Sequence, residues 1–272
     1  MIKKTENSGS MHWYDRDGQP CHTVPYADES KGMRPTNLRD ARKLGLYPSV
    51  TSIIKCVQDF RHYAEQQVVL ASLTLPEIEG ESADSRMRRI LDDAHSHMNE
   101  ARDTGIAIHN ELRKALARET GYGYPELINP VLKQLGKLRE AMEGDRWEAE
   151  KSFACELGFG GQIDALMYKG DQVICVVDFK TKQFGLEDLP KKKLPYDEHA
   201  MQLVAYAYGM GNVSANLINI FISTSEPGTN IIHQWKPEHN ARWFAAFSGL
   251  LSYWQHSKDF HPHAERDSCS EV

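Results

Sequence analysis

The chain has 272 residues, of which 40% are hydrophobic and 26% are charged, so it has an ordinary globular composition and enough length for a large core. Its formal net charge of −6 argues against a generally basic nucleic-acid-binding protein. No stretch reaches the apolar length of a membrane span, and the first ten residues, MIKKTENSGS, lack the apolar core of a signal peptide. We therefore expect a cytoplasmic protein with no membrane partner.

The five cysteines are widely spaced and include no C-x-x-C pair, which indicates neither a structural zinc site nor a disulfide framework. Basic residues gather in three places despite the negative net charge. For any one of these patches alone, a solvated surface is the more common explanation. The patches are Arg34, Arg39, Arg42 and Lys43; Arg86, Arg88 and Arg89; and Lys191, Lys192 and Lys193.

Residues 1–46 are expected to form a small hairpin followed by a polar extension. The pattern alternates over residues 12–24 around Asp17-Gly18, a dipeptide that favours tight turns. A helical region is expected to follow over residues 47–145.

This helical region begins at Pro-Ser-Val-Thr, residues 48–51, where Ser49 or Thr51 can cap the helix that follows. The next helices are expected to be broken near Pro76. In the last of them His109 and Arg113 lie four residues apart and share a face. A lone histidine on such a helix more often has a structural role than a ligand role.

A link rich in Gly and Pro is predicted over residues 122–130, and an amphipathic helix over 131–142. A core strand is then expected over 147–157. Two β-rich runs follow, residues 160–168 and 172–180, and the turn between them makes an antiparallel hairpin the natural prediction.

The hairpin gathers charged side chains on one face. Asp178 and Lys180 are two residues apart in a strand and therefore project the same way, and the turn places Asp164 within a residue or two of opposite Asp178. Two nearby carboxylates repel each other unless a cation neutralises them, which favours a divalent metal site. The alternative is a surface hairpin with solvated charges, but the apolar run over 173–177 indicates a buried strand.

A polar, basic loop is expected over residues 182–195, followed by a helix over 196–210. In this helix Gln202 and Tyr206 lie one turn apart on the same face, a spacing that an incidental amphipathic face would also produce. Two strands, a closing helix and a polar tail expected to be mobile complete the chain: residues 216–223, 231–235, 238–256 and 261–272.

Five short motifs in a fixed order resemble those of the RecB-like branch of the PD-(D/E)xK nuclease superfamily, including phage-type exonucleases and the mitochondrial genome maintenance exonuclease. Each motif is weak alone, and the resemblance extends over about residues 47–224. The motifs are Pro48-Ser49-Val50-Thr51, Gly105-x-x-x-His109, Gly161-x-x-Asp164, Asp178-x-Lys180 and Gln202-x-x-x-Tyr206.

The resemblance implies an α/β fold with a restriction-endonuclease-like core, in which helices flank a central mixed β-sheet. The nuclease core would span residues 146–260, after the N-terminal helical region. It also implies Mg2+ or Mn2+ as cofactor. The implied metal ligands are His109, Asp164, Asp178 and the carbonyl of Phe179.

In the same comparison, Lys180 would position the attacking water, and Gln202 would hydrogen-bond the lysine or the scissile phosphate. The implied DNA contacts are Ser49, Thr51, Arg86, Arg89 and Tyr206, with Tyr206 stacking on a base or sugar. For Ser49 and Thr51, helix capping remains an equal alternative. Some related nucleases hold an iron–sulfur cluster on three C-terminal cysteines, but only Cys269 lies there, so we expect no cluster.

The function expected from this resemblance is metal-dependent DNA exonuclease activity in recombination, repair or replication-end processing, with recombination or single-strand-binding proteins as candidate partners. The helical region before the sheet is expected to cover the metal site and form a passage for a strand end. The alternatives are a structure-specific DNA endonuclease and an inactive nucleic-acid-binding protein of the same fold. A metabolic protein that merely shares a charged hairpin is a third possibility.

Overall fold

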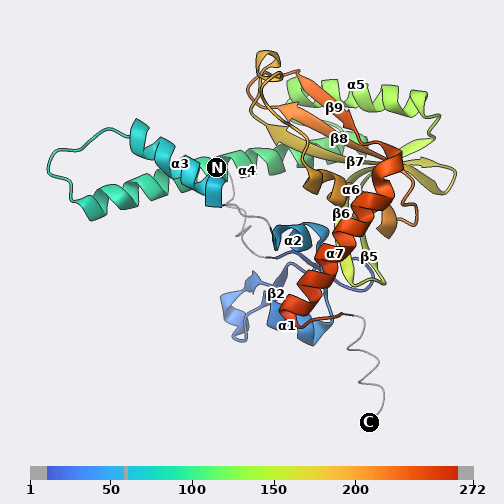
Figure 1. The fold of residues 1–272 in the computed structure, drawn as a ribbon, viewed down its shortest axis with the longest axis horizontal. Coiled ribbons are helices and arrows are strands. Elements are labelled where there is room, and N and C mark those ends of the chain that lie inside the picture. The colour runs from blue at the N-terminus through green and yellow to red at the C-terminus, as the bar shows by residue number, and fades with distance from the viewer. Residues whose placement is uncertain (1–10, 58–60, 263–272) are drawn as a thin grey trace, which may run out of the picture.

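The computed structural model describes residues 11–57 and 61–262 (Figure 1). At its centre is a five-stranded sheet in which β7 and β8 are parallel and the other neighbours are antiparallel. This mixed sheet, flanked by helices, confirms the α/β class. In spatial order the strands are β5 (Arg146–Cys155), β6 (Phe159–Lys169), β7 (Gln172–Lys182), β8 (Asn216–Ser223) and β9 (Asn230–Gln234).

The predicted hairpin is formed by β6 and β7, and its turn has Gly170 at a φ of 59°, a conformation that glycine adopts without strain. The two strands pair from Lys169↔Gln172 as far as Ala165↔Val177. Beyond that point β6 continues to pair with β5, and β7 continues to pair with β8. The sheet therefore forks between β6 and β7.

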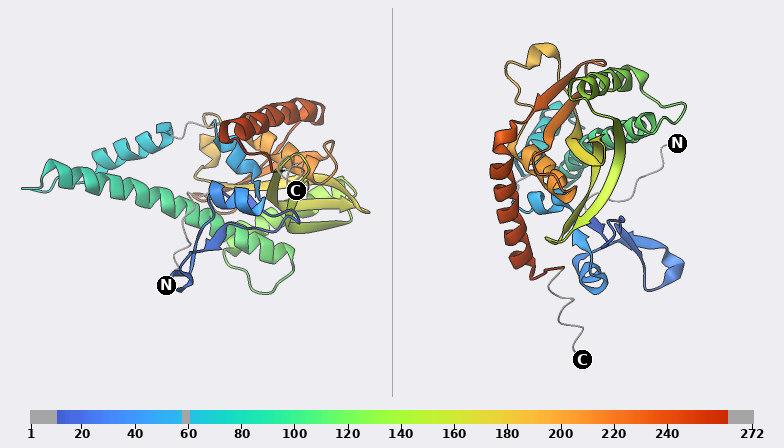
Figure 2. Two further views of the ribbon diagram at one scale, coloured as in Figure 1. Left: turned by 90° about the horizontal axis from the view of Figure 1, so that it is seen from below. Right: turned by 90° about the vertical axis from the view of Figure 1, so that its right-hand side faces the viewer.

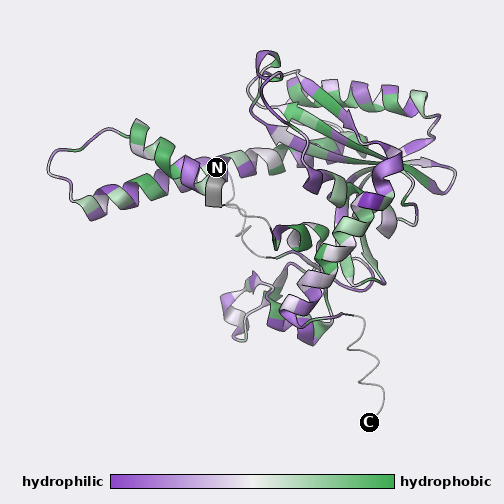
Figure 3. Ribbon diagram, viewed as in Figure 1, coloured by the Kyte–Doolittle hydropathy of each residue, from purple (hydrophilic) through white to green (hydrophobic). Residues whose placement is uncertain are grey.

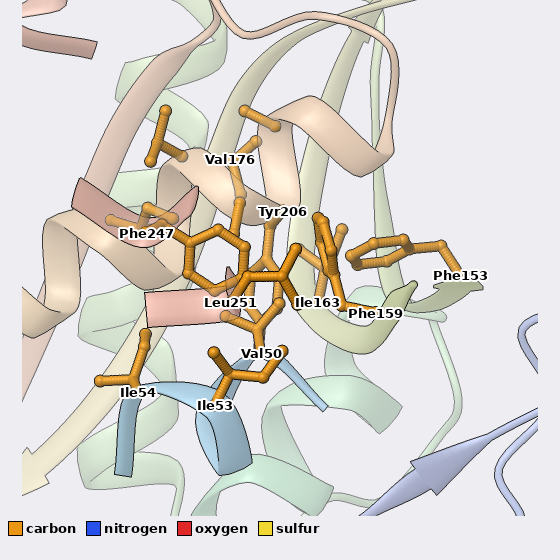
Figure 4. Close-up of a cluster of buried hydrophobic side chains, with 14 of the residues drawn as sticks. Val50, Ile53, Ile54, Phe153, Phe159, Ile163, Val176, Tyr206, Phe247 and Leu251 are labelled. Carbon is orange, nitrogen blue, oxygen red and sulfur yellow. The ribbon is translucent and has the colours of Figure 1, made fainter. Parts of the chain in front are cut away.

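Helices cover both faces of the sheet (Figure 2). One face packs against the C-terminal half of α4 (Ala83–Leu116) and against α5 (Pro125–Ala141). The other face packs against α2 (Val50–Lys55), α6 (Asp197–Gly209) and α7 (Asn240–Lys258). Figure 4 shows side chains of these three helices meeting those of β6.

The helices form because their apolar residues recur at helical spacing. In α7, Phe247, Leu251 and Trp254 are all buried, and in α5 so are Ile128 and Val131. Figure 3 shows hydrophobic residues concentrated in the central strands and on the inner sides of these helices. No helix in the described ranges combines the length and the apolar character needed to cross a membrane.

The predicted link over 122–130 is wrong from residue 125 on, because α5 already begins at Pro125. Proline suits the first turn of a helix, where its missing N–H has no partner to lose. Leu127 and Ile128 are buried against the sheet, and this packing keeps the helix continuous through Pro130.

The N-terminal hairpin predicted over 12–24 exists only as a turn, with a single bridge between Tyr14 and Pro20. The strands of this segment pair mainly with residues that come later in the chain. The two additional sheets pair β1 (Trp13–Tyr14) with β4 (Tyr47–Pro48) and β2 (Thr23–Pro25) with β3 (Met33–Pro35). Trp13 is fully buried and contacts Trp254, so burial of this side chain decides the pairing.

The remaining helices are α1 (Leu38–Leu44), α3 (Arg61–Thr74) and three 3-10 turns, Glu29–Lys31, Leu186–Asp188 and Pro237–His239. The predicted break near Pro76 is confirmed, since α3 and α4 form a helical hairpin around it. Much of this hairpin projects away from the sheet (Figure 1). The tail expected to be mobile lies, from residue 263 on, outside the described residues.

Candidate active site

The fork in the sheet places two carboxylates side by side. Asp164 directly precedes Ala165 and Asp178 directly follows Val177, the last pair of β6 and β7, so both carboxylates lie where backbone pairing between these strands has ended. Asp164 Oδ2 instead accepts a hydrogen bond of 2.8 Å from the Phe179 backbone N–H. A side-chain carboxylate thus satisfies a strand donor that the missing ladder would leave open.

Asp178 forms the floor of the site and is only 2% exposed. Three side chains donate to its carboxylate, which therefore has partners on both oxygens. Lys180 Nζ lies 3.0 Å and Gln202 Nε2 lies 2.8 Å from Oδ1, and Asn219 Nδ2 lies 2.8 Å from Oδ2. Each of these donors comes from a different position around the fork, which fixes the orientation of the carboxylate.

The helix α6 supplies a second layer of contacts. Gln202 Oε1 accepts from Lys180 Nζ at 3.1 Å, while Gln202 Nε2 also donates to the Tyr206 hydroxyl at 3.0 Å. Gln202 and Tyr206 lie one turn apart, so the predicted shared face is present. A Cβ added to Gly161 would lie 2.7 Å from the Tyr206 ring, and only glycine leaves room for this packing.

Tyr206 is 4% exposed, and burial raises its pKa well above the usual value. A ring this deeply buried offers no face to a base, so the expected stacking role is wrong. Its hydroxyl instead holds Gln202 in place. The spacing predicted correctly that Gln202 and Tyr206 share a helix face. It did not predict that this face of α6 would be buried against the sheet.

His109 reaches the fork from the opposite face of the sheet. Its Nδ1 lies 3.3 Å from Asp164 Oδ1, and its ring meets the edge of Phe179 with centroids 6.1 Å apart. One turn earlier in α4, a Cβ on Gly105 would lie 3.0 Å from Thr181 Oγ1. The glycine therefore allows α4 to approach β7 closely, which brings the imidazole to the carboxylate.

The charges of the site act strongly on one another because they are buried. Burial raises the pKa of Asp178; the Lys180 charge opposes this shift and the Asp164 charge adds to it. Burial alone would raise the pKa of Asp164, but the His109 charge, together with Lys180 and the Phe179 N–H, lowers it overall. Burial alone would lower the pKa of His109, but the two carboxylates raise it. Asp164 and His109 therefore favour an ion pair, whereas the pKa of Asp178 stays raised because Lys180 offsets only part of the cost of burying its charge.

Sequence reasoning missed Asn219, which is fully buried. Its Nδ2 holds Asp178, and its Oδ1 accepts a 2.8 Å hydrogen bond from Trp235 Nε1. The available signal was the amide of Asn219 between two isoleucines in the apolar middle of β8. Buried polar side chains need partners, so an asparagine flanked by apolar residues on both sides indicates a buried polar group on a neighbouring strand.

A third carboxylate near the fork was also missed as a site residue. Glu150 stands in β5 opposite Asp164 and has a φ of 50°, a left-handed conformation that is costly for a residue with a side chain. Burial raises the pKa of Glu150, and the charge of Asp164 adds to the shift against the opposing charges of Arg113 and His109. Arg113 Nε lies 3.5 Å from its Oε2.

For the two DNA contacts predicted at the start of α2, the structure shows helix capping by Ser49 but does not decide the role of Thr51. Ser49 is the N-cap of α2 and its Oγ accepts from the Ser52 N–H at 3.0 Å, so the capping alternative holds for Ser49. Thr51 Oγ1 lies 3.1 Å from Ser49 Oγ, and the side chain is half-buried. A phosphate contact by Thr51 stays a prediction.

Arg86 and Arg89 do not join the site. Arg89 precedes His109 by 20 residues in the same helix, which at 1.5 Å per residue puts it about 30 Å away. Arg86 forms an ion pair with Glu77 and Arg89 one with Glu81, at the far end of the α3–α4 hairpin. The expected passage lined by this cluster is therefore wrong, because the hairpin projects outward rather than over the fork.

The donor chemistry of the fork suits a hard divalent cation, since it offers carboxylate oxygens and one imidazole nitrogen. Within residues 11–57 and 61–262, no group of three or more His, Cys, Asp or Glu side chains has a preformed metal-binding arrangement. Hydrogen bonds to Lys180, Gln202 and Asn219 already hold Asp178. Both carboxylate oxygens of Asp178 therefore already have hydrogen-bond partners within the chain.

No known protein family matches the chain, and no curated protein matches it either. One solved structure that does match is described as "Crystal structure of SSO0001". The TM-score is 0.29 and the sequence identity 14%, with 71% of this chain and 87% of that chain covered.

Proposed function

We propose that the protein is a metal-dependent phosphodiester hydrolase that acts on DNA, with cleavage from strand ends as the first candidate activity. The observation that carries the proposal is the cluster of Asp164, Asp178 and Lys180 at the fork of the sheet, with His109 beside it. An ammonium next to paired carboxylates is suited to the hydrolysis of a phosphodiester, because the carboxylates can bind a metal ion and the ammonium can stabilise negative charge on the phosphate.

His109, Asp164, Asp178 and the carbonyl of Phe179 would hold Mg2+ or Mn2+. When bound, such an ion would lower the pKa of a water molecule bound to it, so that the water loses its proton more easily, and the ion would also polarise the phosphate. The protein itself orients the ligands: the Phe179 N–H holds Asp164, while Gln202 and Asn219 hold Asp178.

Lys180 is the cation that faces the substrate in this proposal. Its side chain is 27% exposed, whereas that of its partner Asp178 is 3% exposed, so the ammonium lies at the open side of the floor. Gln202 holds the ammonium from the other side. Lys180 would therefore stabilise the negative charge that grows on the phosphate oxygens and would position the attacking water.

We expect His109→Ala to weaken activity most at low metal concentration, because the imidazole is proposed as a ligand. Excess Mn2+ should restore part of the activity, since Mn2+ accepts nitrogen ligands more readily than Mg2+. Isothermal titration of Mn2+ into the wild-type protein and the variant gives a second measurement that does not depend on cleavage. His97→Ala, on the exposed part of α4, is a matched control. Unchanged metal affinity and an unchanged metal-titration curve of activity would leave His109 with a structural role.

Linear DNA is expected to be degraded from its ends, while covalently closed circles of the same sequence survive. The measurement is digestion of end-labelled linear and closed circular DNA, single- and double-stranded, with Mg2+ or Mn2+. Because the α3–α4 hairpin does not roof the fork, any restriction to strand ends must come from elements around the fork itself. Steady cleavage of closed circles would favour the second candidate, a structure-specific endonuclease, and would leave the metal site standing.

A nucleic-acid-binding protein without catalytic activity is the remaining candidate. The observation in its favour is that Asp178 is fully hydrogen-bonded by three side chains of the chain itself. Binding to DNA without cleavage under any divalent ion would select this candidate. Roles in recombination, repair or replication-end processing, and a recombination or single-strand-binding partner, remain predictions.

A further inference from the structure

A group of lysines continues from the proposed active site along the end of β7. Lys180 and Lys182 are two residues apart in the strand and so share a face. Lys182 Nζ donates to the Leu194 carbonyl at 2.9 Å, which ties it to the loop over 183–195. This loop carries Lys192 and Lys193, and Figure 1 shows it protruding beyond the sheet.

An aromatic ring lies among these ammonium groups. The Tyr196 ring has Lys182 Nζ at 4.6 Å and Lys193 Nζ at 5.2 Å from its centroid. The residue is 39% exposed, in contrast to the buried Tyr206. Its backbone N–H donates to His199 Nδ1 at 3.2 Å, so the ring sits on the rigid start of α6.

Acidic residues lie near these lysines in the chain, Glu187 and Asp188 in the same loop and Asp197 and Glu198 directly after Tyr196. Among the described residues, Lys182, Lys192 and Lys193 form no ion pair with a carboxylate. Burial lowers the pKa of Lys182 to about 8; the charge of Glu198 opposes this shift, and those of Lys180 and Lys192 add to it. Burial also lowers the pKa of Lys55, the last residue of α2, and repulsion from Lys180 adds to the shift. A nearby polyanion would relieve this repulsion.

Resting on the proposed function, we propose that Lys180, Lys182, Lys193 and Tyr196 form the path of a single-stranded DNA segment next to the active site. The lysines would bind the backbone phosphates and the tyrosine ring would stack on a base. This pairing of cations with an exposed ring is how proteins bind single strands, because every base has a face that can stack. Duplex bases are already stacked on each other and gain nothing from the ring.

Lys193 covers part of the ring, but it is exposed and can move onto a phosphate without breaking a buried contact. Lys182 has a structural bond to Leu194 and is therefore a poor residue to remove. The charge variant chosen for the test is Lys193→Gln. The control is Lys133→Gln, which removes the same charge from an exposed position of α5, on the opposite face of the sheet.

The test measures binding of a fluorescent 20-nucleotide oligothymidine by anisotropy, in EDTA so that no cleavage occurs, over a series of KCl concentrations. Removal of one lysine that neutralises a phosphate should reduce the slope of log K against log salt by about 0.7. We expect the Lys193→Gln variant to show this reduction and the α5 control to keep the wild-type slope. An equal slope in all three proteins would overturn the path.

The ring is tested separately with Tyr196→Leu and Tyr196→Phe. Loss of one stacked base should weaken single-strand binding by about tenfold or more in Tyr196→Leu, while Tyr196→Phe keeps the ring and should bind normally. A blunt duplex should bind both variants equally. Identical reductions for duplex and single strand, or no reduction with leucine, would overturn the single-strand assignment.

These outcomes separate the path from the catalytic proposal. Lysine- and ring-dependent binding in a protein that never cleaves DNA would support the path and refute the nuclease. Normal metal-dependent cleavage, with binding that is insensitive to all the variants, would refute the path and leave the nuclease standing.

Discussion

Replacement of Asp178 by Asn is expected to lower the rate of DNA cleavage by on the order of a hundredfold or more, and Lys180→Met by a similar factor. Loss of one aligned charged group in a water-poor site typically has an effect of this size. Asp178→Asn removes the charge of a proposed metal ligand but keeps an oxygen that can accept from Lys180 and Gln202. Asp178→Ala would be a harsher change, because it leaves three donors around the floor without an acceptor.

The matched controls are Asp171→Asn in the hairpin turn and Lys169→Met beside it, both exposed and outside the fork. Single-turnover cleavage of a labelled oligonucleotide at saturating Mn2+ measures the effect, and circular dichroism checks that each variant is folded. Near-normal cleavage by either site variant would remove that residue from the active site. Equal reductions in the controls would point to a general defect of the hairpin.

Gly161→Ala is expected to destabilise the protein by about 1 to 3 kcal/mol, the usual range when a methyl group is forced into a packed core. The added Cβ would lie 2.7 Å from Tyr206 Cε1 and 3.0 Å from Phe153 Cε1. Both rings are buried and contact each other edge to face, so neither can move away freely. A displaced Tyr206 would also release Gln202, and the rate of cleavage should fall with the stability.

The same substitution at Gly136 provides the control, because an added Cβ there meets nothing within 4 Å and the residue lies in α5. Gly136→Ala should stabilise the protein by about 0.5 to 1 kcal/mol, the usual gain of alanine over glycine in a helix. Urea unfolding followed by circular dichroism measures both free energies. If Gly161→Ala proves as stable as the wild type, the Tyr206 packing is looser than the structure indicates.

Local patterns in the sequence were sufficient for most of the core elements. The β6–β7 hairpin, the shared face of Asp178 and Lys180, and the shared face of Gln202 and Tyr206 all follow from strand and helix periodicity, which depends only on neighbouring residues. The order of the motifs led to the candidate site residues at the fork. Their roles as metal ligands remain predictions of the resemblance.

Long-range packing decided what these patterns could not. Periodicity predicted that Asp164 lies near Asp178, but the end of β6–β7 pairing at Ala165 and Val177 is a property of the whole sheet. We expected Trp13 in a local hairpin, but its strand, β1, pairs with β4 because Trp13 is buried against Trp254. Most of the link expected over 122–130 is part of α5, because its apolar residues pack against the sheet.

The sequence also did not predict the direction in which α4 projects or the burial of Tyr206. A helix pattern does not state where the helix points, and α4 carries Arg89 about 30 Å from His109 because the helix is straight and continuous over 34 residues. A helix face does not state what it packs against, and Gly161 admits Tyr206 into the core only once α6 and β6 are in contact. The sequence by itself therefore determined which residues could form a charged site. The tertiary structure decided which of them meet, because a contact between distant segments depends on the space that both sides leave.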